Sequence, residues 1–343
     1  MEDITTEPTP GKSFLGSPLA TGEASSERAL RPTRLVDYVG QSDMRSAIEV
    51  MIGAAKIRDE ALDHVLLYGP PGLGKTTMAN IIANELGVTI RHTSGPAIER
   101  AGDLVAILTS LEPHDVLFID EIHRLRNDLE EILYSALEDY AVDIVAGTGP
   151  GARTLRLSIE PFTCIGATTR AGTITGPLRD RFGAAFHLEF YSTDELEAII
   201  TRSARLLSIN ITPEATTKLA TCARGTPRFA NRLLRRARDE AQITGGDTVS
   251  QDLAALTLRR LRIDGHGLDS ADQAYLAALS STFAGGPAGV TALAASLAED
   301  PLTLEDVVEP YLLRLGLIAR TQRGRILTEA GREYLSATDG ADQ

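Results

Sequence analysis

The sequence has few cysteines, few histidines and no long apolar run. Its two cysteines, Cys164 and Cys222, lie far apart, which argues against the disulfide framework of small secreted proteins. Cys164 falls within an apolar stretch, and we expect it to be a small core residue. The six histidines include no pair three or four residues apart, so a zinc site is not expected. Without a run of about 18 apolar residues or a basic-then-apolar N-terminus, the sequence predicts no membrane span and a cytosolic location.

Positive charge is also scarce. The chain has 34 lysines and arginines against 47 aspartates and glutamates, a formal net charge of −13. Nonspecific binding of nucleic acid by the whole surface is therefore disfavoured, and any DNA contact must come from a local basic patch. At 343 residues the chain is too long for one compact core, and we expect two or three domains.

Residues 64–86, HVLLYGPPGLGKTTMANIIANEL, combine three signals. A short apolar run typical of a buried strand comes first. Residues 69–76 then match the G-x-x-x-x-G-K-[ST] phosphate loop, and apolar residues at helical spacing follow up to Gly87, a predicted helix C-cap. A strand before the motif and a helix after it are the context that supports nucleotide binding.

Each residue type in this loop has a chemical role. Gly72 and Gly74 let successive N–H groups point at phosphate oxygens, and the helix N-terminus adds partial positive charge. Lys75 is expected to reach the β- and γ-phosphates, Thr76 to bind Mg²⁺ through its hydroxyl, and Thr77 to lie beside the nucleotide. The loop therefore predicts binding of a nucleoside triphosphate together with Mg²⁺.

An acidic motif follows further along the chain. Residues 116–120, VLFID, have the pattern of a buried strand ending in Asp120, where a Walker-B acid holds Mg²⁺ through water. Glu121 comes next and is a candidate base toward a water that attacks the γ-phosphate. The pair favours nucleotide hydrolysis over the alternative of a small-molecule kinase.

The first half of the chain alternates strand and helix patterns, which predicts an α/β fold whose parallel sheet is covered on both faces. Expected strands are 88–94, 116–120 and 162–168, expected helices include 103–111 and 129–137, and 142–145 with 154–159 form a hairpin. After 191 the patterns are helical, at 193–206, 213–222 and 227–242. Helices at 270–283, 289–297 and 303–315, followed by strand, turn, strand and a short helix, are typical of a winged helix.

Five segments occur in a fixed order: GPPGLGKTT, LFIDEIHRL, IGATTRAG, PLRDRFG and GTPRFANRLLRR. Together they resemble the AAA+ ATPases. Two more segments, TSGPAIERAGDL and EPYLLRLGLIARTQRGR, make the resemblance strongest to the RuvB family, whose members use ATP to drive branch migration of Holliday junctions in DNA recombination and repair. The similarity runs from residue 30 to residue 335.

The resemblance implies an AAA+ P-loop domain with a parallel sheet, a small α-helical lid domain and a C-terminal winged-helix domain. We assign them to residues 26–191, 192–262 and 263–336. Residues 1–25, rich in Thr, Ser, Pro and Gly, are predicted to be a disordered extension, and 337–343 a flexible tail.

The resemblance also assigns roles to residues that chemistry alone does not select. Thr169 matches sensor 1, which orients the attacking water, and Arg228 matches sensor 2, a cation of the lid that contacts the phosphates. Arg181 matches the arginine finger that reaches the ATP of a neighbouring subunit, with Arg179 as the competitor. Further positions near the nucleotide in the family are Leu30, Arg31, Glu138, Asp139, Tyr140 and Tyr191. Tyr191 also fits a packed core aromatic, and Glu138 a solvated helix end.

Residues 309–332 contain five arginines and two glutamates in a chain that is acidic elsewhere. Such a wing suits salt-sensitive contacts to the DNA backbone, and Arg320 and Arg325 match the family's DNA contacts. The alternative is a basic face on a winged helix that binds a peptide. A second group of arginines is expected to form a helix surface with local salt bridges: Arg232, Arg235, Arg236 and Arg238.

Family members act as rings, and the resemblance implies a homo-oligomer, which we expect to be a hexamer. The 142–159 hairpin is expected to dock on a RuvA-like junction-binding protein through an apolar surface, and a RuvC-like resolvase is a further expected partner. Two alternatives remain open at this point. One is a clamp-loader or initiator ATPase, and the other is a nucleotide-switched scaffold whose winged helix binds protein.

Overall fold

The computed structural model describes residues 29–146 and 153–339. By their internal contacts these fall into two units, Arg31–Phe190 and one that holds everything from Tyr191 onward together with Leu30. The expected N-terminal extension and the glycine-rich tip of the hairpin lie outside the described residues. Within the described residues, no helix has both the length and the apolar character needed to cross a bilayer.

The first unit contains a five-stranded parallel sheet in the order β2-β3-β6-β1-β7. Its strands are β1 (Val65–Tyr68), β2 (Ile90–Ser94), β3 (Val116–Asp120), β6 (Thr163–Thr168) and β7 (Ala184–His187). All six residues of β6 are buried, and so are the first four of β3. The predicted parallel sheet is therefore confirmed. Strand β7 was not predicted, because it is a short edge strand with no fully buried residue.

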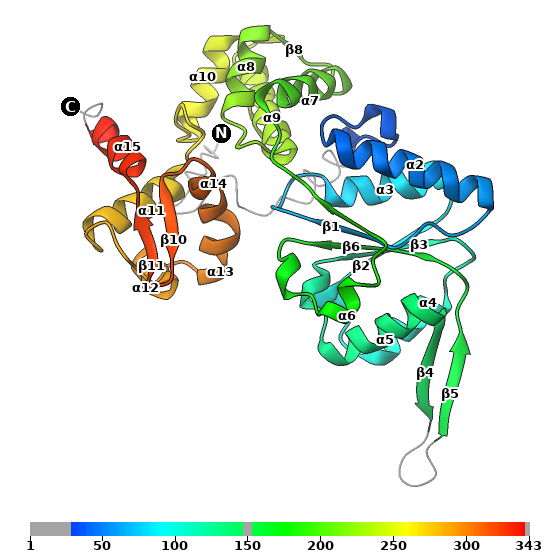
Figure 1. The fold of residues 1–343 in the computed structure, drawn as a ribbon. Helices are drawn as coiled ribbons and strands as arrows, with labels where there is room; N and C mark the ends of the chain where they lie inside the picture. Colours follow the sequence, from blue (N-terminus) through cyan, green and yellow to red (C-terminus); the bar gives the residue numbers. More distant parts are fainter. Residues whose placement is uncertain (1–28, 147–152, 340–343) are drawn as a thin grey trace, which may run out of the picture. The chain divides into compact units, whose positions relative to one another are not determined.

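Helices cover both faces of this sheet (Figure 1). On one face lie α2 (Ser42–Arg58) and α3 (Lys75–Leu86), and on the other α4 (Ala101–Thr109), α5 (Asn127–Asp139) and α6 (Gly176–Arg179). In the described part of this unit, short 3₁₀ turns lie before or between these elements, at Leu35–Asp37, Gly95–Ala97, Ile122–Arg124 and Ala171–Thr173. The core under α4 and α5 includes Cys164, and burial raises the pKa of its thiol to about 12. Cys164 is thus the core residue that the sequence predicted.

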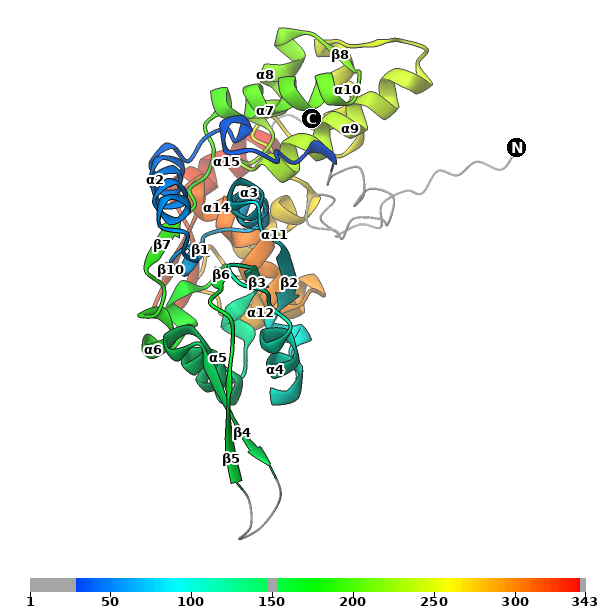
Figure 2. The same cartoon turned by 90° about the vertical axis from the view of Figure 1, so that its right-hand side faces the viewer.

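The predicted hairpin is present. Strands β4 (Ala141–Ala146) and β5 (Arg153–Ser158) pair antiparallel, with Ala141 opposite Ser158. It leaves the end of α5 and projects away from the sheet in both views (Figures 1 and 2).

The second unit begins with a helical domain. Its elements are α7 (Thr193–Leu206), β8 (Asn210–Ile211), α8 (Pro213–Thr221), α9 (Pro227–Ile243), β9 (Thr248–Val249) and α10 (Gln251–Arg260). Each helix starts at a Ser or Thr whose side chain accepts a backbone N–H, the usual N-cap. Helix α10 and the two-residue parallel pair β8–β9 were not predicted.

The arginines of α9 depart in part from expectation. Arg236 and Arg238 do make local ion pairs with Asp239, at 3.1 and 3.0 Å. Arg232 and Arg235 are buried, with 6% and 2% of their surface exposed, so describing them as helix surface was wrong. Local sequence gave no signal for this burial, because arginine is ordinarily exposed and nothing near Arg232 or Arg235 in the chain marks them as different from the other arginines of α9.

The winged-helix domain follows. Its elements are α11 (Ser270–Ser281), α12 (Val290–Leu297), α13 (Pro301–Thr303), a π turn (Leu304–Val308), α14 (Glu309–Arg314), β10 (Ile318–Thr321), β11 (Gly324–Leu327) and α15 (Glu329–Asp339). The π turn interrupts the helix expected at 303–315, where Pro310 has no N–H for the carbonyl four residues earlier. Strands β10 and β11 form the wing, with Arg320 opposite Arg325. Helix α15 runs to Asp339, into the stretch assigned to a tail.

A buried ion cluster joins the helical domain to the winged helix inside this unit. Arg224 has 2% of its surface exposed, and its guanidinium pairs with Asp272 and, at 3.3 Å, with Asp269 at the start of α11. Arg314 donates to the carbonyl of Arg224 at 3.1 Å. Two carboxylates thus share one guanidinium away from water.

This cluster predicts that acid stabilises the second unit. Burial, opposed by Arg224 and reinforced by Asp269, raises the pKa of Asp272 to about 7 from an ordinary 3.8. A carboxyl with a raised folded-state pKa binds more protons when folded, so its stabilisation is complete below about pH 4 and is lost as pH rises through about 7. In urea unfolding at constant ionic strength, wild type should gain stability over Asp272→Asn as pH falls from about 8 to about 5. Parallel pH profiles for the two proteins would contradict this.

Candidate active site at the carboxyl edge of the sheet

Three neighbouring strands end at one edge of the sheet. The phosphate loop follows β1, Asp120 ends β3 and Thr168 ends β6, and both β3 and β1 pair with β6 in parallel. The carboxyl edge of an open α/β sheet is where ligands bind in such folds. The structure therefore brings together the predicted residues Lys75, Thr76, Asp120, Glu121 and Thr169.

Glycine is required at two positions of the loop. Gly69 and Gly74 have φ of 141° and 101°, in the region that favours glycine. A Cβ on Gly74 would lie 2.8 Å from the Tyr38 hydroxyl, and one on Gly69 would lie 2.5 Å from the Leu188 carbonyl oxygen. Tyr38 also donates to the Leu73 carbonyl at 3.3 Å. The sequence did not predict that Tyr38 contacts the phosphate loop, because nothing near Tyr38 in the chain links it to the loop.

Lys75 is held within the loop at the start of α3. Its side chain is buried, and Nζ donates to the carbonyls of Gly69 and Pro70 at 2.7 and 2.9 Å. Thr76 and Thr77 follow in the first turn, where the free N–H groups of the helix point toward the loop. Backbone N–H groups, a lysine and a helix N-terminus form a suitable cradle for phosphate.

The acidic residues lie at the end of β3. The Asp120 carboxylate accepts the backbone N–H of Glu121 at 3.0 Å. Glu121 adopts a left-handed conformation, with φ of 50°, and 37% of its side chain is exposed. Its carboxylate lies 3.5 Å from Nε2 of His123, whose Nδ1 lies 2.9 Å from the Thr168 hydroxyl. Neither His123 nor Thr168 was predicted as a site residue, although the histidine stands two residues beyond Glu121 in the same motif.

Arg181 lies elsewhere. It precedes β7, so it is at the amino edge of the sheet, opposite the phosphate loop. Its Nη2 donates to the Tyr134 hydroxyl and pairs with Glu138 at 2.8 Å, and the guanidinium carbon is 4.6 Å from the centre of the Tyr134 ring. The hydrogen bond with Tyr134 raises the pKa of Arg181. Arg179, the competing candidate, is exposed at the end of α6 on the same side.

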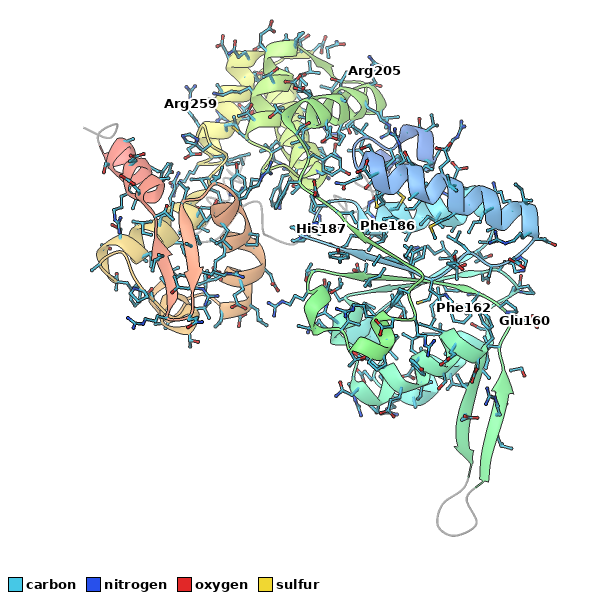
Figure 3. The ribbon with its side chains drawn as sticks, in the orientation of Figure 1. Glu160, Phe162, Phe186, His187, Arg205 and Arg259 are labelled. Atoms are coloured by element: carbon cyan, nitrogen blue, oxygen red, sulfur yellow. The ribbon has the colours of Figure 1, made fainter. Side chains whose placement is uncertain are left out.

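Two more predicted residues lie at this amino edge. Asp139 pairs with Arg156 of the hairpin at 2.7 Å, and the Tyr140 ring packs edge-on to those of His64 and Phe162. Figure 3 shows Phe162 and His187 at opposite ends of the sheet. The structure therefore does not bring Glu138, Asp139 and Tyr140 to the phosphate loop of their own chain.

The remaining predicted nucleotide contacts divide between the units. Arg31 opens the first unit. In the second, the Leu30 carbonyl accepts from Arg202 at 2.8 Å, and the buried Tyr191 donates its N–H to Gly225 at 2.9 Å. Arg228 is exposed in the first turn of α9.

The wing differs from its sequence description. The carboxylate of Glu309 is fully buried and pairs with both predicted DNA contacts, Arg320 at 2.6 Å and Arg325 at 2.9 Å. Arg325 also pairs with Glu305 at 2.7 Å, and the Tyr275 hydroxyl donates to Glu309 at 2.9 Å. Arg320 leaves 45% of its side chain exposed but Arg325 only 14%. Arg325 is thus largely buried between two glutamates, and its contact with DNA stays a prediction.

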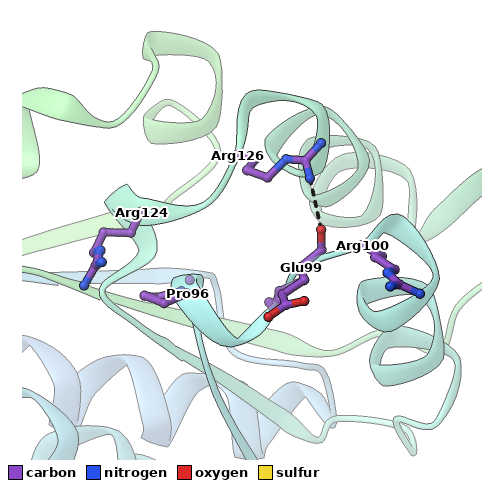
Figure 4. A pocket seen from close by; sticks show the side chains of 7 residues that line it. Pro96, Glu99, Arg100, Arg124 and Arg126 are labelled. Carbon is purple, nitrogen blue, oxygen red and sulfur yellow. Dashed lines mark hydrogen bonds between the residues drawn. The ribbon is translucent and has the colours of Figure 1, made fainter.

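A cavity of about 390 Å³ lies near the end of β2, lined by Gly95, Pro96, Ile98, Glu99, Arg100, Arg124 and Arg126. It contains none of the predicted site residues. Arg100 and Arg124 point away from each other, and Arg126 donates to the Glu99 carbonyl (Figure 4). The arginines therefore do not converge on a shared ligand position.

Comparison with known proteins decides the family. Residues 30–188 match the Holliday junction DNA helicase RuvB P-loop domain, 191–264 the RuvB AAA lid domain and 265–336 the RuvB C-terminal winged helix domain. The solved structure of the Thermotoga maritima RuvB Holliday junction branch migration motor is 47% identical, with a TM-score of 0.82, over 90% of this chain and 98% of that chain. The chain belongs to the RuvB family. A mutant of the same T. maritima protein is 48% identical over the same shares, with a TM-score of 0.83.

Membership of the RuvB family confirms the predicted order of P-loop, lid and winged-helix domains and the reaction class, ATP hydrolysis coupled to movement of DNA. It agrees with the carboxyl-edge geometry, where a phosphate cradle and two carboxylates meet. The roles of individual site residues remain predictions.

Gly74→Ala should impair nucleotide binding. A left-handed conformation costs a residue with a Cβ about 1–2 kcal/mol, and the new methyl would also press on Tyr38. We expect at least about tenfold weaker binding of a fluorescent ATP analogue. The matched control is Gly53→Ala in α2, where a Cβ meets nothing within 4 Å. That change should leave the affinity intact and stabilise the helix by up to about 1 kcal/mol. Equal affinities for the two variants would contradict the requirement for glycine.

Proposed function

We propose that this chain is the ATP-hydrolysing subunit of a ring motor that moves duplex DNA during branch migration of Holliday junctions. The observation behind the proposal is that the candidate catalytic groups of one domain lie at two opposite edges of its sheet. The phosphate cradle and the carboxylates lie at the carboxyl edge, whereas the candidate arginine finger lies at the amino edge. A complete site then needs two copies of the chain.

Each group at the carboxyl edge has a role in hydrolysis. Lys75 and the loop N–H groups bind the β- and γ-phosphates, and Glu121 accepts a proton from the attacking water that Thr169 orients. The hydroxyl of Thr76 and the carboxylate of Asp120 are hard oxygen donors that suit Mg²⁺. When bound, Mg²⁺ neutralises charge on the β- and γ-phosphate oxygens.

We assign the amino-edge residues to the neighbouring subunit's site. Arg181 stabilises the transferring phosphoryl group in trans. Glu138 pairs with Arg181 at 2.8 Å, and Asp139 and Tyr140 follow Glu138 at the end of α5, so we assign all three to the same contact. In the second unit, Arg228 stands at the N-terminus of α9, where helix dipole and guanidinium both favour an anion. This supports its assignment to the phosphates as sensor 2, with Leu30, Arg31 and Tyr191 as further nucleotide contacts.

The hairpin has the features of a surface that binds another protein. Leu155 and Leu157 alternate along β5 and expose 53% and 37% of their surface, on an element that projects from the domain. Exposed apolar side chains in that setting mark an interaction site. We propose that it docks on a RuvA-like junction-binding protein, and that the motor acts as a cytoplasmic hexamer whose junction product is taken by a RuvC-like resolvase.

The ion pairs of the wing arginines favour one competing function, a nucleotide-switched scaffold whose winged helix binds protein. Glu309 and Glu305 cancel the charges of Arg320 and Arg325. Arg323 at the turn is exposed, however, and extends the basic surface beyond that cluster. DNA dependence of the ATPase separates the two functions.

Arg181→Ala should retain ATP binding and lose hydrolysis by a factor of about 10³–10⁵, because a trans finger acts only on the transition state. Arg179→Ala is the matched comparison, since it removes the exposed guanidinium on the same edge. Mixing Arg181→Ala with a Glu121→Gln variant should restore some turnover, because an intact base then meets an intact finger at a mixed interface. Normal turnover by Arg181→Ala alone, or loss only in Arg179→Ala, would reject Arg181 as the finger.

The ATPase rate should rise with duplex DNA and that stimulation should fall with salt. Arg320→Ala and Arg323→Ala should each weaken it and reduce the salt slope by about 1. Arg320→Ala and Arg325→Ala should also destabilise the wing by about 1–3 kcal/mol, since each removes one partner of the buried Glu309, whereas Arg323→Ala leaves those ion pairs intact. Melting curves of all three variants provide the control. A rate indifferent to DNA at every salt concentration would favour the scaffold.

A further inference from the structure

His123 joins two strand ends of the active site. It belongs to the 3₁₀ turn Ile122–Arg124 directly after Glu121, and 10% of its side chain is exposed. One ring nitrogen, Nε2, lies 3.5 Å from the Glu121 carboxylate, and the other, Nδ1, lies 2.9 Å from the hydroxyl of Thr168. Thr168 closes β6 and immediately precedes the predicted sensor, Thr169. The imidazole therefore bridges the candidate base on β3 to the strand end on β6 that carries the predicted sensor.

The hydrogen bonds around Thr168 are compatible with a proton on Nε2 of His123. The Thr168 hydroxyl accepts the backbone N–H of Arg170 at 2.9 Å, and its single hydrogen is then available to donate to Nδ1. An Nδ1 that accepts belongs to a neutral imidazole protonated on Nε2. That tautomer directs N–H at the carboxylate of Glu121. At 3.5 Å the contact is longer than a good hydrogen bond, so it guides the carboxylate without fixing it.

Glu121 needs such guidance. More than a third of its side chain is exposed, and a flexible carboxylate in that position samples several rotamers. A general base must lie within hydrogen-bond reach of the water whose proton it takes. His123 is itself nearly buried and anchored on Thr168, whose surface is 0% exposed, so it supplies a rigid reference for Glu121.

We propose that His123 is a positioning residue for Glu121: its Nε2–H guides the carboxylate toward the attacking water, and Thr168 anchors the imidazole. The inference rests on the proposed role of Glu121 in ATP hydrolysis. His123 touches neither nucleotide nor water in this account, so it acts on turnover through Glu121 alone.

Two substitutions of His123 test its contacts with Glu121 and with Thr168 separately. In His123→Gln the amide nitrogen falls near the position of Nε2, so the contact to Glu121 is retained. In His123→Asn the amide falls near the position of Nδ1, so only the contact to Thr168 is retained. Thr168→Val removes the hydroxyl from the other side at nearly constant volume, and Thr168→Ser restores it.

The experiment measures kcat, KM, ATP affinity and melting temperature for these variants, with wild type and Glu121→Gln as references. We expect kcat of His123→Asn to fall about 10- to 100-fold, as when a supporting hydrogen bond of a catalytic group is removed. KM and melting temperature should stay near wild type. His123→Gln should recover most of kcat, Thr168→Val should fall in the same direction, and Thr168→Ser should recover.

Other outcomes overturn the proposal. Equal kcat for His123→Asn and wild type would mean that Glu121 needs no support from Nε2. Equal losses in the Asn and Gln variants with lower melting temperatures would make His123 a structural tether only. Normal turnover in Glu121→Gln would instead remove the proposed role of Glu121 itself, a failure that the His123 variants do not produce.

Discussion

The register of β3, β6 and β1 is the constraint on which the active site depends. Neighbouring strands lie about 4.8 Å apart, so three adjacent ends span about 10 Å, the scale of a triphosphate with its metal. That alignment holds only while the strands stay in parallel register, because a slip of one residue turns every side chain to the other face. The buried side chains of β3 and β6, covered by helices on both sides, oppose such a slip.

The local part of this arrangement was predictable from the sequence. The phosphate loop, the acid at the end of β3 and the helix caps depend on residues within a few positions of one another. Helix α10 also had a local signal, the N-cap Ser250, and was overlooked. By contrast, β7 has no fully buried residue, and the two-residue strands β8 and β9 pair across α8 and α9. No periodicity along the chain encodes such pairings.

Contacts between distant residues account for most of what the sequence did not predict in the site. The bridge through His123 needs β3 and β6 to be neighbours, and Tyr38 reaches Gly74 only after the chain has folded. The wing is a sharper example. Counting five arginines against two glutamates suggests a strongly basic surface, but the buried Glu309 accepts both Arg320 and Arg325. Net charge in a segment therefore overstates the charge that its folded surface offers to DNA.

The position of Arg181 bears on how subunits would contact one another. If a subunit offers its phosphate cradle at one edge of the sheet and its finger at the other, the contact between subunits joins two different surfaces. Such a heterologous contact repeats from copy to copy and ends only when the rotation closes a ring. In the proposed ring, hydrolysis at one site is coupled to the subunit that supplies the finger, since Arg181 is tied to Glu138 and Tyr134 of its own α5.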